Sequence, residues 1–89
     1  MNWIIDFSPN SLKFLQKNNL SEDFIIDKIK IALRKFKGEQ LNIDIKKLSG
    51  KWEGFYRIRI GKLRIILEFQ FRNYKVFVEE IDWRGGAYR

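Results

Sequence analysis

Residues 54–69, GFYRIRIGKLRIILEF, constrain the fold of this chain more than any other segment. Gly61 and Lys62 separate two runs of β-branched and aromatic residues. Glycine at the first central position of a two-residue loop is typical of a type II′ hairpin turn. The sequence therefore predicts an antiparallel hairpin, and a turn at this point places Arg59 directly opposite Arg64.

The predicted hairpin has two faces of different chemistry, because directly opposed residues point to the same side of a sheet. One face is apolar and consists of Tyr56, Ile58, Ile60, Leu63, Ile65, Leu67 and Phe69. The other carries three guanidinium groups and consists of Phe55, Arg57, Arg59, Arg64, Ile66 and Glu68. We expect helices to cover the apolar face and the arginine-bearing face to stay open.

A short strand and two helices are predicted in the N-terminal half. Residues 2–7 alternate as a half-buried strand does. Ser8, a hydroxyl N-cap followed by proline, begins a helix over about 9–18. Ser21 caps a second helix, which ends at Gly38. The buried stripe of the second helix is expected to consist of Ile25, Ile29, Ala32, Leu33 and Phe36.

The C-terminal half is predominantly β. Residues 39–54 predict an extended segment that leads into a turn, and β-rich runs follow at 55–60, 63–71 and 75–82. The order is β-α-α-β-β-β, so we expect an α+β fold with two N-terminal helices packed on one face of a mainly antiparallel sheet. A length of 89 residues suits a single domain over residues 1–89.

The chain contains neither cysteine nor histidine. This composition excludes disulfides, thiolate metal sites, His-ligated zinc and Ser-His-Asp triads. Any catalysis must therefore use Arg, Lys, Tyr, Asp, Glu or groups of the substrate. No apolar stretch approaches the roughly 20 residues that span a bilayer, and the N-terminus lacks the pattern of a signal peptide. We accordingly expect a cytoplasmic protein that does not associate with membranes.

The net charge of +7 is concentrated in the C-terminal half, since residues 45–89 carry eleven Lys or Arg against five Asp or Glu. Such asymmetry indicates an acidic partner, with nucleic acid as the first candidate, or a solvated basic surface that serves solubility. Phe55 and Trp52 offer rings on which RNA bases can stack, unless these rings fill the core. The basic residues in the loops that flank the hairpin are Lys46, Lys47, Lys51 and Lys62.

Three arginines on one open face require a counter-charge. Like charges directly opposed across two strands destabilise a sheet by roughly 0.2–1 kcal/mol. We therefore predict that an anion binds between Arg57, Arg59 and Arg64, and phosphate fits this role best. The alternative is that Glu68, Glu79 or the carboxylates of a partner protein neutralise the arginines.

The C-terminal residues DWRGGAYR follow the last predicted strand. Arg84 and Tyr88 stand four residues apart around two glycines. Composition alone favours a frayed tail. The strand end that precedes this segment neighbours the arginine hairpin, however, so the segment can also fold back over the open face. Arg84 then adds a fourth cation there, and Tyr88 adds a ring or a hydroxyl.

The chain as a whole resembles the RelE/ParE superfamily of toxins from toxin–antitoxin systems, and specifically its RelE branch. The resemblance is carried by FSPNSLKFL near the start, by DIKKLSGKWEGFYRIRIGKLRIILEF in the centre and by IDWRGGAYR at the end. These segments follow one another in the order of the family, and the match covers essentially all 89 residues.

The resemblance implies a cytoplasmic toxin of β-α-α-β-β-β design that a cognate antitoxin neutralises. It implies entry into the A site of the 70S ribosome and cleavage of mRNA there, by attack of the ribose 2′-OH on the adjacent phosphate with the 5′-oxygen leaving. It implies neither a metal nor another cofactor. The antitoxin is expected to cover the sheet or displace the C-terminal tail with an acidic or amphipathic helical segment.

The resemblance also assigns residues. It places the family's two basic hairpin positions on Arg57 and Arg59, its next-strand arginine on Arg64, its C-terminal arginine on Arg84 and its C-terminal tyrosine on Tyr88. The four arginines would hold the scissile phosphate and stabilise charge that develops in the transition state. Tyr88 would stack on a base or position the 2′-OH.

Two departures from the family concern acid–base chemistry. The family often has lysine at the first two hairpin positions, and the arginines of this chain keep their protons and cannot act as bases. The general base is therefore left open among Lys51, Lys62, Glu53, Tyr88 and a ribosomal component. Trp83 stands where relatives often have histidine, and it can stack on RNA or pack within the protein but cannot transfer a proton.

Three functions follow from this pattern. The first is a metal-independent endoribonuclease, which the arginines on one face support. The second is a ParE-type inhibitor of DNA gyrase without enzymatic activity, against which the retention of the arginines and the C-terminal tyrosine argues. The third is an RNA-binding member of the same fold in which catalysis is weakened or lost.

Overall fold

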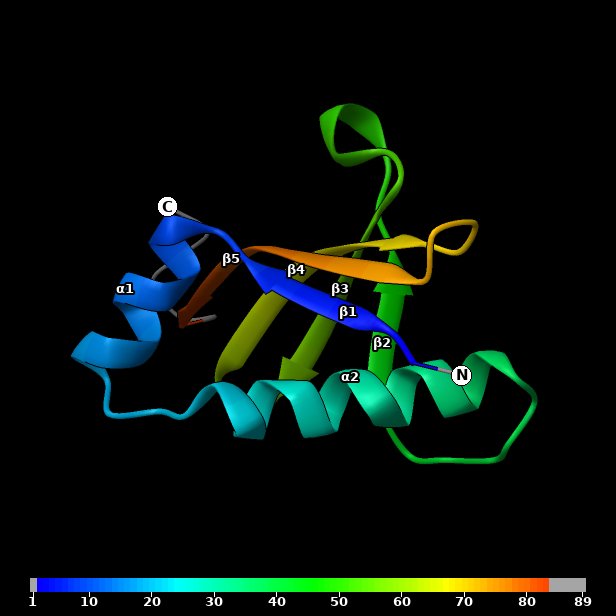
Figure 1. Ribbon diagram of the computed structural model, residues 1–89, viewed down its shortest axis with the longest axis horizontal. Helices are drawn as coiled ribbons and strands as arrows, with labels where there is room; N and C mark the ends of the chain where they lie inside the picture. Colours follow the sequence, from blue (N-terminus) through cyan, green and yellow to red (C-terminus); the bar gives the residue numbers. More distant parts are fainter. Residues whose placement is uncertain (1, 84–89) are drawn as a thin grey trace.

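The computed structural model describes residues 2–83, which form two helices and a five-stranded sheet (Figure 1). The elements in chain order are β1 (Ile4–Phe7), α1 (Pro9–Lys17), α2 (Glu22–Phe36), β2 (Asp44–Lys47), the 3₁₀ turn η1 (Gly50–Trp52), β3 (Phe55–Ile60), β4 (Leu63–Gln70) and β5 (Lys75–Trp83). Within the described residues, neither helix is long and apolar enough to cross a membrane.

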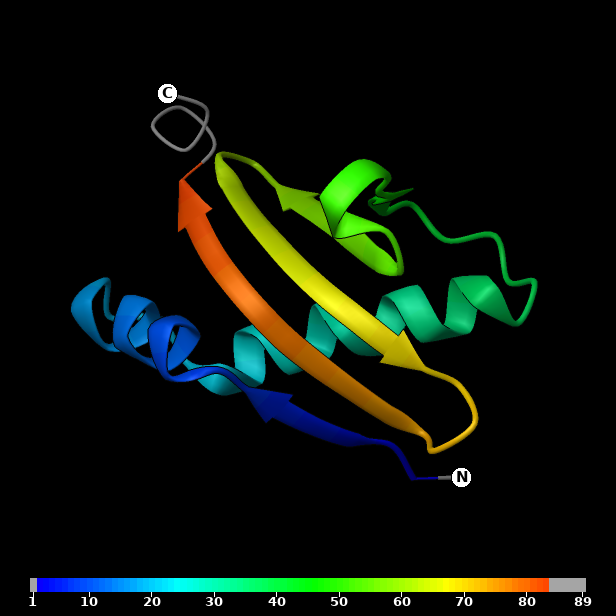
Figure 2. The ribbon, with the colours of Figure 1, turned by 90° about the horizontal axis from the view of Figure 1, so that it is seen from above.

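The sheet has the strand order β1-β5-β4-β3-β2. β1 runs parallel to β5, and the other three pairings are antiparallel. Figure 2 shows β4 and β5 as two long, curved strands side by side, with α2 behind the sheet. The predicted α+β fold with a mainly antiparallel sheet is confirmed, and the extended segment predicted over 39–54 contributes one more strand, β2.

The predicted caps define both helices. The Ser8 hydroxyl accepts a hydrogen bond from the Ser11 backbone N–H, with Pro9 in the first turn. The Ser21 hydroxyl likewise accepts from the backbone N–H of Phe24. α2 then ends just before Gly38, whose φ of +103° is a conformation that glycine adopts without strain.

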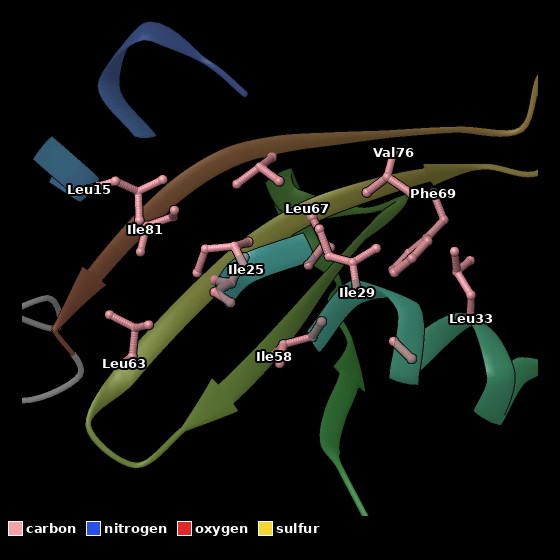
Figure 3. Packing of buried hydrophobic residues seen from close by; sticks show 13 residues of the cluster. Leu15, Ile25, Ile29, Leu33, Ile58, Leu63, Leu67, Phe69, Val76 and Ile81 are labelled. Atoms are coloured by element: carbon pink, nitrogen blue, oxygen red, sulfur yellow. The ribbon is translucent and has the colours of Figure 1, made fainter. Parts of the chain in front are cut away.

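The core lies between the sheet and α2 (Figure 3). Ile25 and Ile29 of α2 are fully buried against the sheet, and Leu15 of α1 joins the same cluster. Phe36, by contrast, is 38% exposed and packs edge-on against the ring of Tyr56 at the end of the helix. The core strand residues are Ile58, Leu63, Ile65, Leu67, Phe69, Val76, Val78 and Ile81.

The hairpin of β3 and β4 has the predicted register. Arg59 pairs with Arg64, and the residues of the apolar face alternate with those of the open face as expected. Gly61 has a φ of +58°, as the first central residue of a type II′ turn requires. The short turn therefore fixes which residues face the helices and which face outward.

An irregularity in β5 changes which of its residues face outward. Val76 and Val78 are opposite core residues of β4, but the register shifts between Ile66 and Leu67, so that Glu80 pairs with Ile66. Such a β-bulge inserts one extra residue and reverses the alternation beyond it. As a result Glu80 and the residues that alternate with it, rather than Glu79, lie on the open face of the sheet.

Candidate functional site

A row of four charged residues crosses the open face from β2 to β5. Asp44 pairs with Arg59, Arg59 with Arg64, and Arg64 with Asp82. The two arginines are opposed as the sequence predicted, and each has an acidic residue on its outer neighbour strand. Asp82 offsets part of the repulsion between the two guanidinium groups through its ion pair with Arg64, whereas the carboxylate of Asp44 contacts Arg57.

Arg64 is held by Asp82 in a two-pronged pair. Its Nε donates to Oδ1 at 3.0 Å and its Nη2 donates to Oδ2 at 2.8 Å. The two side chains are 13% and 22% exposed, so the pair is largely shielded from water. Such fork-to-carboxylate geometry is both strong and directional. Arg64, which belongs to the central strand β4, is therefore fixed in one orientation on the open face.

Arg57 is held by Asp44 through a single contact, with Nη1 donating to Oδ1 at 3.1 Å. Arg57 is buried, although Asp44 itself is exposed. The alternative that carboxylates neutralise the arginines holds for Arg57 and Arg64 within the described residues, but the carboxylates are those of Asp44 and Asp82 and not of Glu68 or Glu79. Glu68 instead accepts a hydrogen bond from the amide of Gln70.

Arg59 differs from its two neighbours. Its Nε is buried, and no residue in the described range 2–83 accepts a hydrogen bond from it. A buried donor without an acceptor costs about 1–3 kcal/mol, and more when it belongs to a charged group. The Nε of Arg59 thus lacks an acceptor among the described residues, and the same side chain lines the hollow described next.

The three arginines line one hollow of about 570 Å³ on the open face. Lys46 and Trp52 line it as well, and the ring of Trp52 packs edge-on against that of Phe55 at 5.3 Å. A volume of this size lies within the range of about 300–1,000 Å³ of small-ligand sites. The complete lining is Lys46, Lys47, Leu48, Ser49, Trp52, Arg57, Arg59, Arg64, Ile66 and Glu80. The hollow combines cations for a phosphate with an aromatic ring for a base.

Glu80 is a member of this lining that the sequence analysis did not single out. A hydrogen bond to the Asp82 carboxylate is the main reason that the pKa of Glu80 is raised above its ordinary value. Partial burial and the charges of Asp82 and Glu79 raise this pKa further, while the nearby guanidinium of Arg64 lowers it. The sequence signal was the acidic cluster EEID at the end of the last strand, but the bulge that orients it cannot be predicted from alternation.

Replacement of Glu80 by Gln is expected to stabilise the fold at neutral pH and not in acid. The folded pKa of Glu80 lies above that of an unfolded glutamate, about 4.3. The wild type therefore loses stability as pH rises from the unfolded pKa of Glu80 through its folded pKa. Glu80→Gln keeps the hydrogen bond to Asp82 but carries no charge at any pH. We expect a small gain above the folded pKa, limited by solvent screening at this partly exposed site, that disappears below about pH 4. Thermal unfolding at several pH values measures this difference, and equal curves at all pH values would contradict it.

The other predicted site residues lie outside the hollow. Lys51 in η1 and Lys62 in the hairpin turn are both exposed and do not line it. Trp83 lies on the helix-covered side, opposite Leu63, where its Nε1 donates to Asn18 at 3.2 Å. Its ring packs near that of Phe14, although the residue is 45% exposed, and it does not line the hollow.

Two further predictions concern residues that the structure does not describe, since Arg84 and Tyr88 both lie outside the range 2–83. Within that range, no group of three or more acidic side chains is arranged to hold a metal ion.

No protein-family model matches the sequence, and no curated protein does. Solved structures, however, match over nearly the whole chain. A chain of the RelB–RelE antitoxin–toxin complex from Methanococcus jannaschii is 24% identical with a TM-score of 0.59, covering 93% of this chain and 94% of that one. The chain has the fold of the RelE-type toxins.

Two more structures support the same RelE fold. A chain of the archaeal RelE–RelB complex from Pyrococcus horikoshii is 22% identical with a TM-score of 0.61, and the match covers 98% of this chain and all of that one. A chain of the DinJ–YafQ toxin–antitoxin complex from E. coli has a TM-score of 0.68 at 12% identity, with full coverage of both chains. The fold expected from the RelE resemblance is thereby confirmed.

Proposed function

We propose that this protein is the toxin of a type II toxin–antitoxin system and that it cleaves mRNA in the ribosomal A site without a metal. The observation that carries the proposal is the basic hollow on the open face, in which Arg59 has a buried donor without an acceptor among the described residues. A phosphate of an RNA backbone supplies acceptors for the guanidinium groups of this hollow and negative charge that offsets its excess of cations.

The arrangement of the arginines suits phosphate-ester cleavage. Asp44 and Asp82 hold Arg57 and Arg64 in place before any substrate arrives, so little reorganisation is needed during the reaction. With the phosphate between Arg57, Arg59 and Arg64, the 2′-oxygen attacks phosphorus and the bond to the 5′-oxygen breaks. The guanidinium groups stabilise the additional negative charge on the phosphoryl oxygens.

When the protein is not bound to RNA, its proposed partner is an antitoxin with acidic side chains. Neighbouring structures with this fold were determined as complexes with antitoxins. An antitoxin carboxylate over the hollow would provide Arg59 with the acceptor that residues 2–83 do not offer. Binding of RNA and of such a segment would then exclude each other.

A pair of inhibition assays tests the proposed function against gyrase inhibition. The purified protein is added to a reconstituted translation reaction and, separately, to a gyrase supercoiling reaction. Loss of translation with unaffected supercoiling supports the ribonuclease proposal. Inhibition of supercoiling alone would overturn it in favour of a gyrase poison.

Replacement of Trp52 by Ala is expected to weaken RNA binding. Stacking of a base on an aromatic ring contributes about 1–3 kcal/mol, so we expect the dissociation constant of a short single-stranded RNA to rise about 5- to 150-fold. Fluorescence anisotropy at fixed salt measures the change. Trp3→Ala is the matched control, because Trp3 packs against Phe71 and Tyr74 away from the hollow. Equal weakening by both variants would contradict a stacking role for Trp52.

A further inference from the structure

The proposed cleavage requires a group that accepts the proton of the 2′-OH. Arginine keeps its proton at any physiological pH and cannot serve. The candidates from the sequence that lie within the described residues, Lys51, Glu53 and Lys62, do not line the hollow. Among the described residues that do line it, Glu80 is the acidic one.

The geometry of the sheet directs Glu80 toward the arginines. Glu80 is opposite Ile66, which is itself opposite Arg57, so the three residues form one row across β5, β4 and β3. Without the bulge in β5, strict alternation from Val78 would turn Glu80 toward the helices. Bulges often redirect a side chain next to an active site, and here the bulge brings a carboxyl group into the basic hollow.

The two carboxyl groups of this strand end have different roles. Asp82 accepts two hydrogen bonds from Arg64 and is held in that pair. Glu80 makes no ion pair within the described residues, and its pKa is raised mainly by the hydrogen bond to Asp82. A carboxylate of raised pKa is a stronger base than an ordinary glutamate and works closer to neutral pH. The charged groups around it are Glu79 and Asp82 of β5, Arg64 of β4, Arg57 and Arg59 of β3, and Lys46 and Lys47 of β2.

We propose that Glu80 is the general base of this site and that it takes the proton from the 2′-OH of an RNA whose phosphate lies between the arginines. The inference rests on the proposed ribonuclease function. A bond forms between the 2′-oxygen and phosphorus, and the bond from phosphorus to the 5′-oxygen breaks. The 5′-oxygen leaves with the electron pair and takes a proton from water. The products are a 2′,3′-cyclic phosphate and a 5′-hydroxyl, and Glu80 returns its proton to solvent.

The test is single-turnover cleavage of a defined mRNA on purified ribosomes by the wild type and by Glu80→Gln. The glutamine keeps the size and the hydrogen bond of the side chain but cannot accept the proton. We expect the cleavage rate to fall about 10²- to 10⁴-fold, the usual contribution of a general base, with ribosome binding unchanged. The wild-type rate should fall in acid as Glu80 becomes protonated, and the variant should lack this dependence.

Glu79→Gln provides the matched control. It removes the same charge from the neighbouring residue, and the side chain of Glu79 does not line the hollow. It should cleave at the wild-type rate. Cleavage by Glu80→Gln at the wild-type rate with the wild-type pH profile would overturn the role of Glu80 and leave the ribonuclease function intact. Absence of cleavage by the wild type itself, on ribosomes and on naked mRNA, would overturn the ribonuclease function and the role of Glu80 with it.

Discussion

Arg59→Ala is expected to lower the rate of mRNA cleavage on ribosomes by about 10²- to 10³-fold, which is the usual loss when one donor that stabilises transition-state charge is removed. The reason is that Arg59 lines the hollow together with Arg57 and Arg64, so its guanidinium lies beside a phosphate bound there, and its Nε has no acceptor among residues 2–83. The same feature predicts little loss of stability, because the substitution also removes a buried donor without a partner. Single-turnover cleavage and thermal unfolding measure the two effects.

Two variants control for this prediction. Arg72→Ala removes an exposed arginine from the turn between β4 and β5, outside the hollow, and should leave cleavage unchanged. Arg59→Lys keeps a positive charge but lacks the planar guanidinium group. Its cleavage rate should therefore lie between the rates of the wild type and of Arg59→Ala. A large loss of stability in Arg59→Ala with normal cleavage per folded molecule would show that Arg59 supports the fold and not the reaction.

Asp82→Asn is expected to lower the free energy of unfolding by about 1–3 kcal/mol, the range for hydrogen bonds to charged groups. The asparagine cannot reproduce the two charge-assisted hydrogen bonds to Arg64, and both side chains of this pair are mostly shielded from water. For a domain of this size, each kcal/mol corresponds to a change in Tm of about 4–8 °C. Cleavage should fall as well, since Arg64 loses the contact that fixes its orientation. Chemical denaturation measures the stability effect directly.

Asp44→Asn is the matched comparison, because it removes the same charge from the opposite end of the same row. Asp44 is 57% exposed, and its ion pair with Arg57 has an N···O distance of 3.1 Å, so we expect the loss of this ion pair to cost below about 1 kcal/mol. A larger loss for Asp44→Asn than for Asp82→Asn would contradict the view that the shielded two-pronged pair is the stronger support of the site.

The shared face of the arginines could be predicted because its determinants are local. A two-residue turn at Gly61 fixes the register of β3 and β4, and the period of two then assigns each residue to a face. The caps at Ser8 and Ser21 are equally local and mark the helix starts correctly. Short-range geometry thus determined most of the helix boundaries and the hairpin.

The counter-ions of the arginines could not be predicted because they depend on long-range pairing. Asp44 belongs to β2, whose register against β3 is not set by a tight turn. Glu80 and Asp82 lie on the open face of the sheet only because a bulge reverses the alternation of β5, and of the two only Glu80 lines the hollow. The sequence suggested Glu79 instead, which is the residue that an unbroken alternation from Val76 and Val78 would place on the open face.

The interpretation of Trp83 depended on the same strand. Its position after the bulge places it on the helix-covered side, where it packs near Phe14 at a ring distance of 5.4 Å and donates to Asn18. Its aromatic character alone could not distinguish a stacking platform for RNA from a packing contact with α1.

Primer extension on a defined mRNA held in purified 70S ribosomes tests the central claim most directly, with naked mRNA as the parallel reaction. If the protein cleaves mRNA in the ribosomal A site, primer extension should end at a new position within the A-site codon. This new end should appear only when both the protein and the ribosome are present. Stops at the same positions in naked mRNA would contradict ribosome dependence. The absence of any new stop in either reaction would contradict the ribonuclease function itself.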